Sequence, residues 1–195
     1  MHRRRAKPGV FGTIQALFGS RDGVSTVEFA MLAPVILMIL AGIVDLGGAL
    51  RVKFQLSSAA TSGSYYALLN ADKVSATGGS DLASKIAAIA ASSISGAAKS
   101  ISVVVNNGSS STVSDSTTTP GGTAANADKC YCPTLSGTTV AWGSAVTCGS
   151  VCSTGGGFAG KFVSISVSRP YSPLFSGYGI VSAGNITVRS VVQPQ

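Results

Sequence analysis

The strongest constraint on the fold is one uninterrupted apolar run, FAMLAPVILMILAGIV at residues 29–44, which carries no charged side chain. Glu28 and Asp45 bracket this run. The 17 helical steps between them cover about 25 Å at about 1.5 Å per residue, against about 30 Å for a bilayer hydrocarbon core. We therefore expect one membrane-spanning helix with both carboxylates near opposite interfaces, where a charge costs less than at the bilayer centre.

Positive charge is concentrated before this run. Residues 1–23 carry five Lys/Arg against one Asp, a net charge of 5 − 1 = +4, whereas only Arg51 and Lys53 follow closely on the far side. Cytoplasmic flanks of membrane helices carry the excess of Lys and Arg, so residues 1–23 are predicted to be a basic cytoplasmic leader. Phe11 and Phe18 are its only aromatic residues, which is not the pattern of a nucleic-acid-binding segment, and we expect no nucleic-acid partner.

Two simpler interpretations of this segment stay open. A signal peptide would be cut after small residues such as Ser58-Ala59-Ala60, although these lie beyond Arg51 and Lys53 and far from the end of the apolar run. The other is a plain uncleaved anchor. Pro34 lies inside the predicted helix and is expected to bend it, which membrane helices tolerate.

The residues directly before the apolar run, GVSTVEF at 23–29, resemble a prepilin-peptidase site: a glycine, four residues, a glutamate and an aromatic residue. The resemblance implies cleavage between Gly23 and Val24 on the cytoplasmic side, ahead of Glu28 and Phe29. Cleavage would leave an α-ammonium group on Val24, one helical turn from Glu28. Glu28 could neutralise that amine in its own chain or in a neighbour's, where low dielectric makes an unpaired charge expensive.

Residues 27–50, VEFAMLAPVILMILAGIVDLGGAL, resemble the TadE-like family of the tight-adherence (Flp) pilus apparatus. They show its Val-Glu-Phe-Ala opening, its proline-containing apolar run and its acidic close, here Asp45-Leu46-Gly47. Residues 163–175, VSISVSRPYSPLF, also look like the family's late strand and tyrosine-containing turn.

This resemblance implies a minor pilin or pseudopilin that is processed by a prepilin peptidase and needed to assemble adhesive pili. The implied partners are membrane lipid, the peptidase, and other pilin or pilus-machinery subunits. The implied location is the bacterial inner membrane, with the carboxyl-terminal domain in the periplasm and the protein either in the filament or at its base.

We expect a pilin-like α+β fold. Its long transmembrane helix, residues 24–71, continues into a small periplasmic domain, residues 72–195, with a short antiparallel sheet. The side chains of the helix extension expected to face the domain are Ala59, Ala60, Tyr65, Tyr66, Leu68 and Leu69.

Within that domain the sequence predicts one helix and three strands. After a break at 77–79, Ser80-Asp81 supplies an N-cap ahead of Leu82, Ile86 and Ile89, which share one helix face. The predicted strands are 101–106, which ends at an Asn107-Gly108 turn, 162–168 and 186–192. The Ser/Thr/Gly-rich stretch 109–123 is predicted to be a loop.

Four cysteines form two clusters in a glycine-rich segment at 130–160, namely Cys130 with Cys132 and Cys148 with Cys152. Outside the cytoplasm oxidation is expected, and four cysteines allow three pairings. A bond between Cys130 and Cys132 would close a very tight ring, so bridges between the clusters are favoured. The alternative is a zinc site, but structural zinc sites have two to four residues between paired cysteines, and Cys130 and Cys132 have one.

The residues give little support to catalysis. The only histidine is His2, so no Ser-His-Asp or Cys-His set can form, and we expect no enzyme activity, no metal and no cofactor. A membrane-anchored binding module, whose cysteine-braced segment recognises a surface or cell-wall ligand, is the alternative function. Asp45 is interpreted as a membrane-boundary acid, or as the partner of Arg51 or of another subunit's cation.

Overall fold

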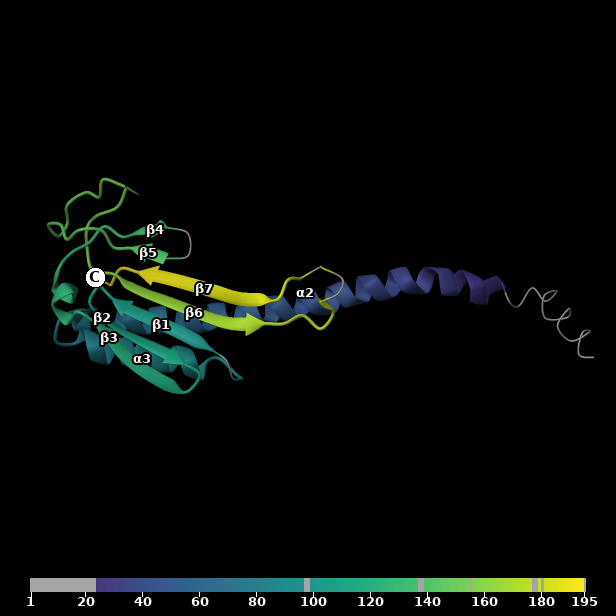
Figure 1. Cartoon of the computed structure of the whole chain (residues 1–195). Coiled ribbons are helices and arrows are strands. Elements are labelled where there is room, and N and C mark those ends of the chain that lie inside the picture. The colour runs from purple at the N-terminus through teal and green to yellow at the C-terminus, as the bar shows by residue number, and fades with distance from the viewer. Residues whose placement is uncertain are drawn as a thin grey trace, which may run out of the picture.

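The computed structural model describes residues 24–96, 99–136, 139–154, 156–176, 179 and 181–194. The predicted basic leader, with Gly23, lies outside the described residues. The described chain forms a long helix with a small α+β domain at its carboxyl-terminal end, and the amino-terminal half of the helix stands clear of the domain (Figure 1).

The long helix is α2, Val24–Leu69, whose 46 residues span about 69 Å at about 1.5 Å per residue. It remains helical through Pro34. The predicted extension beyond the membrane segment is confirmed, although the helix ends at Leu69 and Ala71–Lys73 form a 3-10 turn, η2. One continuous helix therefore serves both as the apolar segment and as part of the domain.

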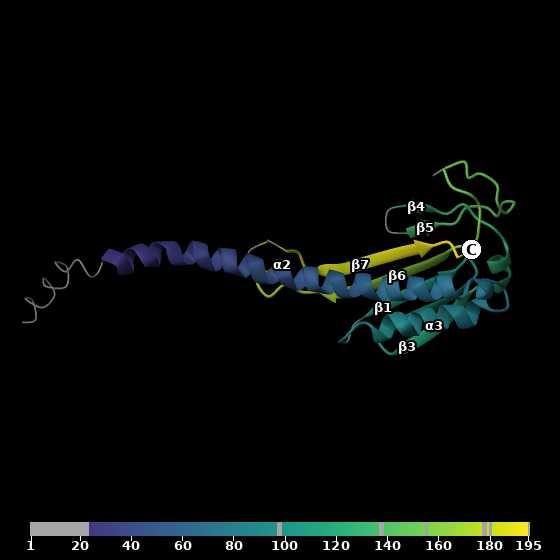
Figure 2. The ribbon, with the colours of Figure 1, turned by 180° about the vertical axis from the view of Figure 1, so that it is seen from behind.

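A five-stranded antiparallel sheet forms the other layer, in the order β3-β2-β1-β6-β7. Figure 2 shows α2 and the second helix, α3, on the same face of this sheet. A two-stranded hairpin, β4–β5, and a 3-10 turn, η3, complete the fold. The bounds are α3 Gly79–Ser92, β1 Ser100–Val105, β2 Ser109–Ser114, β3 Thr117–Gly122, η3 Ala124–Asp128, β4 Thr134–Ser136, β5 Thr139–Ala141, β6 Val163–Tyr171 and β7 Gly184–Val192. The predicted α+β architecture is confirmed.

The face of α2 that packs on the domain consists mainly of small residues, and Leu56, Ala59, Ala60, Gly63 and Ala67 lie on it. Their spacing of three and four keeps them on one side of the helix. A Cβ atom at Gly63 would lie 3.1 Å from the side chain of Ile86 on α3 and 3.2 Å from that of Ile165 on β6. The small side chains thus let α2 lie close to both elements.

The predicted packing of the Tyr/Leu cluster is only partly right. Ala59 and Ala60 are buried and Tyr66 is partly buried, but Tyr65, Leu68 and Leu69 are exposed. The buried stripe at 56, 59–60, 63–64 and 67 fixes the helix face, and positions 65, 68 and 69 fall outside it at 3.6 residues per turn. The hydrophobicity of these side chains suggested that they belong to the core, but the helical period places Tyr65, Leu68 and Leu69 outside the buried face of α2.

The prediction of a loop at 109–123 is wrong, because this stretch forms β2 and β3. On β2 the buried residues alternate as Ser109, Ser111 and Val113, and the strand packs against α3. Serine is small enough for this close contact, so the strand lacks the apolar alternation that normally reveals one. β3 is an exposed edge strand, where Pro120 is tolerated because an edge need not donate every backbone N–H group.

The helix N-cap and the strand-ending turn that the sequence predicts both differ in position from those in the structure. α3 begins at Gly79 without a side-chain cap, so Ser80-Asp81 lies inside the first turn and not at the N-cap. There Asp81 forms a 2.8 Å ion pair with Lys85, which raises the pKa of Lys85 through a hydrogen bond and charge attraction. At the β1–β2 hairpin the residues with positive φ are Asn106 and Asn107, the pattern of a two-residue type I′ turn.

Candidate functional site

The amino-terminal half of α2 is an apolar helix without a covering layer. Within 25–40 every side chain is exposed except that of Ala33, which is half-buried. The helix is long and apolar enough to cross a membrane: its most apolar 18-residue window has a mean hydropathy of 2.4 and is 6 % buried. Such a large apolar surface is stable only in apolar surroundings. Single-pass membrane anchoring follows from this helix.

The predicted processing residues lie at the free end of this helix. Val24 is the first residue of α2, while Gly23 precedes the described residues. Glu28 and Phe29 are one turn further on and are both exposed, Phe29 by 67 %. Glu28 and Phe29, the predicted processing residues whose exposure the structure describes, are therefore accessible to another molecule.

Asp45 occupies an unexpected environment. Its side chain is only 1 % exposed, although it belongs to the apolar end of the helix. The backbone N–H groups of Leu174 and Phe175 donate to the two carboxylate oxygens, at 2.8 Å to Oδ1 and 3.0 Å to Oδ2. The Tyr171 hydroxyl donates to the backbone carbonyl oxygen of Asp45 at 2.6 Å. We call this set of contacts among Asp45, Tyr171, Leu174 and Phe175 the Asp45 clamp.

The clamp joins the two segments that the sequence resemblance identified, the acidic close of the apolar run and the turn after β6. Within the described residues Asp45 does not form an ion pair with Arg51, one of the alternatives from the sequence. Nor does the helix end at Asp45, since α2 continues to Leu69. A buried carboxylate is costly unless it is hydrogen-bonded, and the two N–H donors supply that compensation.

Gly48 allows the aromatic side of the clamp to form. A Cβ atom on Gly48 would lie 2.8 Å from the Tyr171 hydroxyl oxygen, whereas a Cβ atom on the neighbouring Gly47 would meet nothing within 4 Å. Tyrosine is a rigid side chain, so it cannot retreat from such a contact without leaving Asp45. Glycine at 48 is thus required by the close approach of Tyr171 to the helix.

Replacing Gly48 by alanine is therefore expected to displace the Tyr171 hydroxyl from Asp45 and to lower the free energy of unfolding by about 1 kcal/mol relative to Gly47→Ala. Both substitutions gain the same helix propensity, so their difference isolates the contact with Tyr171. Urea unfolding of the two variants in detergent measures it. Equal stabilities of the two variants would contradict this role of Gly48.

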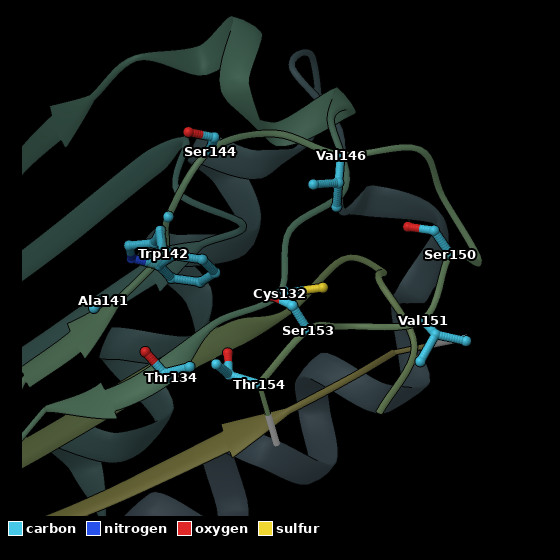
Figure 3. A pocket seen from close by; sticks show the side chains of 11 residues that line it. Cys132, Thr134, Ala141, Trp142, Ser144, Val146, Ser150, Val151, Ser153 and Thr154 are labelled. Atoms are coloured by element: carbon cyan, nitrogen blue, oxygen red, sulfur yellow. The ribbon is translucent and has the colours of Figure 1, made fainter. Parts of the chain in front are cut away.

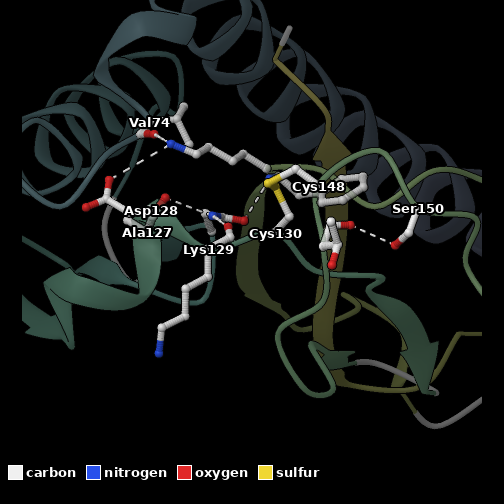
Figure 4. The surroundings of a disulfide bond; sticks show 11 residues. Val74, Ala127, Asp128, Lys129, Cys130, Cys148 and Ser150 are labelled. Atoms are coloured by element: carbon white, nitrogen blue, oxygen red, sulfur yellow. Dashed lines mark hydrogen bonds and ion pairs between the residues drawn. A yellow bond between two sulfur atoms is a disulfide. The ribbon is translucent and has the colours of Figure 1, made fainter.

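The cysteine-containing segment is held by two disulfides. Cys130–Cys148, shown in Figure 4, has its Cα atoms 5.1 Å apart, and Cys132–Cys152 has them 5.6 Å apart. Each bridge joins one cluster to the other, as favoured from the sequence, and the sulfurs are thereby not available as zinc ligands. Loops of 18 and 20 residues are closed in this way, and each closure stabilises the fold by about 3 kcal/mol.

The start of this segment is fixed to the sheet. The buried Asn106 side chain donates to the carbonyl oxygens of Ala127, at 2.9 Å, and Lys129. The side-chain oxygen of Asn106, Oδ1, accepts a hydrogen bond from the Phe162 N–H group at 3.1 Å. The next residue back along the chain, Lys161, donates to the Val74 carbonyl oxygen at 2.8 Å. The two disulfides therefore brace a segment whose first residues are already hydrogen-bonded to Asn106 in the β1–β2 turn.

The braced segment encloses an open concavity of about 490 Å³ (Figure 3). Trp142, Thr134, Ser144 and Val151 are among its lining residues. The Trp142 ring packs edge-on against Tyr131, with the ring centroids 6.0 Å apart. This is the surface on which a binding function of the domain would depend.

Comparison with known families finds a match to part of the chain. The family model described as TadE-like protein matches residues 23–64, a range that includes Glu28, Asp45 and Gly48. The resemblance predicted from the sequence is confirmed over this range. Neither the curated proteins nor the solved structures contain a significant match to the chain.

Proposed function

We propose that this chain, on the premise of its TadE-like segment at 23–64, is a minor pilin or pseudopilin of a tight-adherence pilus system. In this proposal a prepilin peptidase cuts between Gly23 and Val24, and the mature protein is needed for pilus assembly. The observation that carries the proposal is the exposed apolar half of α2, which begins at Val24 and lies within the family match.

Cleavage at this bond fits the physical character of the helix. It would remove the leader with its net charge of 5 − 1 = +4 and leave an amine at the start of α2. Glu28, exposed one turn away, could then neutralise that amine or the amine of an adjacent subunit. Pilus subunits that pack through their apolar helices would need such a pairing inside the membrane.

The proposed location is the bacterial inner membrane, with the amino terminus in the cytoplasm and the domain in the periplasm. The excess of cations before the apolar run supports this orientation. The two disulfides also support it, since such bonds persist in oxidising compartments. The proposed partners are lipid, the prepilin peptidase and other pilin or pilus-machinery subunits, and the proposed role requires no catalysis.

A membrane-anchored binding module is the second candidate. The concavity beside Trp142 favours it, because a braced surface with an aromatic side chain is a common form of ligand site. In this candidate the anchor and the helix remain as described, and only the purpose of the domain differs.

Deletion of the gene in its bacterium separates these functions. The first proposal predicts that cells without the chain assemble no adhesive pili, and that the full-length gene restores them while the level of the major pilin subunit stays unchanged. Normal pili with lost adherence would favour the binding module. Normal pili with normal adherence would contradict both.

A further inference from the structure

The clamp lies at the edge of the membrane segment. A hydrocarbon core of about 30 Å corresponds to about 20 helical residues, and counted from Phe29 these end near Gly48. Asp45 is therefore within one helical turn of the outer boundary of the hydrocarbon region. The exposed side chains of Leu46 and Leu50 extend the apolar surface of α2 to the same level, and Arg51 and Lys53 follow.

The clamp also fixes the position of the turn at 171–175 along the axis of α2. Because the Leu174 and Phe175 N–H groups both donate to the Asp45 carboxylate, their backbone must lie beside residue 45. Figure 1 shows the described residues that follow β6 reaching along α2, away from the body of the domain and toward the amino-terminal half of the helix. This turn is thus the part of the sheet layer closest to the proposed membrane.

Two side chains of the turn, those of Leu174 and Phe175, are apolar and exposed. Leu174 is 79 % exposed and Phe175 is 41 % exposed, and Tyr171 precedes them with its hydroxyl on the helix backbone. Exposed leucine and phenylalanine side chains at the tip of a turn are costly in water but favourable at the boundary of headgroups and acyl chains. Tyrosine is also enriched at this level of membrane proteins.

We propose that the turn at 171–175 is a second membrane-contact element, with Leu174 and Phe175 inserted into the outer leaflet. The backbone of the same turn covers the Asp45 carboxylate and separates it from lipid, while the side chains make the lipid contact. Together with α2, this second contact fixes the orientation of the domain relative to the membrane surface. The inference rests on the proposed membrane span of α2.

Tryptophan quenching in vesicles tests this contact. The full chain is reconstituted into phosphatidylethanolamine and phosphatidylglycerol vesicles, with and without brominated acyl chains, after Trp142→Phe has removed the native tryptophan. Single tryptophans are then introduced by Leu174→Trp, by Leu37→Trp in the span and by Leu135→Trp on β4, a strand of the domain well away from α2's free half (Figure 1). The native side chains are 79 %, 62 % and 70 % exposed, so none of the changes disturbs the core.

Bromination is expected to reduce the emission of the Leu174→Trp protein by roughly half, as for a side chain at the headgroup–acyl boundary. The Leu37→Trp protein should be quenched more strongly, and the Leu135→Trp protein should be unaffected. Quenching at position 37 without quenching at 174 would overturn the proposed contact, whether the turn then meets water or another protein. Absence of quenching at position 37 would instead overturn the membrane span itself.

Discussion

Asp45→Ala is expected to free the turn at 171–175 from α2. The variant removes both acceptors of the Leu174 and Phe175 N–H groups. Hydrogen bonds to a charged group contribute about 1.5–3 kcal/mol each, so losing about 3 kcal/mol in total should speed hydrogen exchange of these two amides by on the order of a hundredfold. Hydrogen–deuterium exchange of the reconstituted protein, resolved to this turn, measures the effect.

Two further variants sharpen this test. Asp45→Asn keeps one carbonyl acceptor for two N–H donors, so exchange should rise by an intermediate amount. Asp81→Ala removes an exposed acid that forms a surface ion pair with Lys85 within α3, and it should leave exchange in the turn unchanged. If these two amides exchanged equally fast in Asp45→Ala and in the unsubstituted protein, the clamp would not be what holds the turn to α2.

Gly23→Leu is expected to abolish processing, so that the protein keeps residues 1–23. The resemblance of 23–29 to a prepilin-peptidase site implies that the residue before the cut must be glycine, and a leucine side chain would then prevent access to the bond. The membrane-bound chain would gain the mass of the uncut leader and would no longer support pilus assembly. Amino-terminal sequencing of the membrane fraction measures the first effect directly.

Gly19→Leu provides the matched control for this change. It places the same side chain in the same leader, four residues before the proposed cleavage site, and processing should continue. If the Gly23→Leu protein still began at Val24, the specific role of Gly23 would be wrong. If the unsubstituted protein in membranes began at its first residues, the chain would be an uncleaved anchor.

Features that depend on local pattern were predictable from the sequence. The apolar run and its continuation as a helix follow from residue type, and both appear in α2. The grouping of the cysteines was enough to favour bridges between the clusters, but not to choose between the two ways of making them. That choice depends on how the 130–160 segment folds back on itself, as its pairing of Cys130 with Val146 and of Tyr131 with Gly160 shows.

Features that depend on distant contacts were not predictable. Asp45 and Leu174 are separated by 129 positions, and the partner groups are backbone N–H groups, which every sequence contains. The glycine at 48 gives a weak signal, but nothing in the sequence identifies Tyr171 as its neighbour. The strand at 109–114 was missed because its buried face is partly serine, which reads as a loop by composition.

The proposed membrane anchoring, processing and export of this chain can be tested together by the intact mass of the protein from the membrane fraction. The account predicts a chain that begins at Val24 and that accepts alkyl groups on its four cysteines only after reduction. A full-length chain that is recovered without detergent from the cytosol, with all four thiols open to alkylation before reduction, would contradict it.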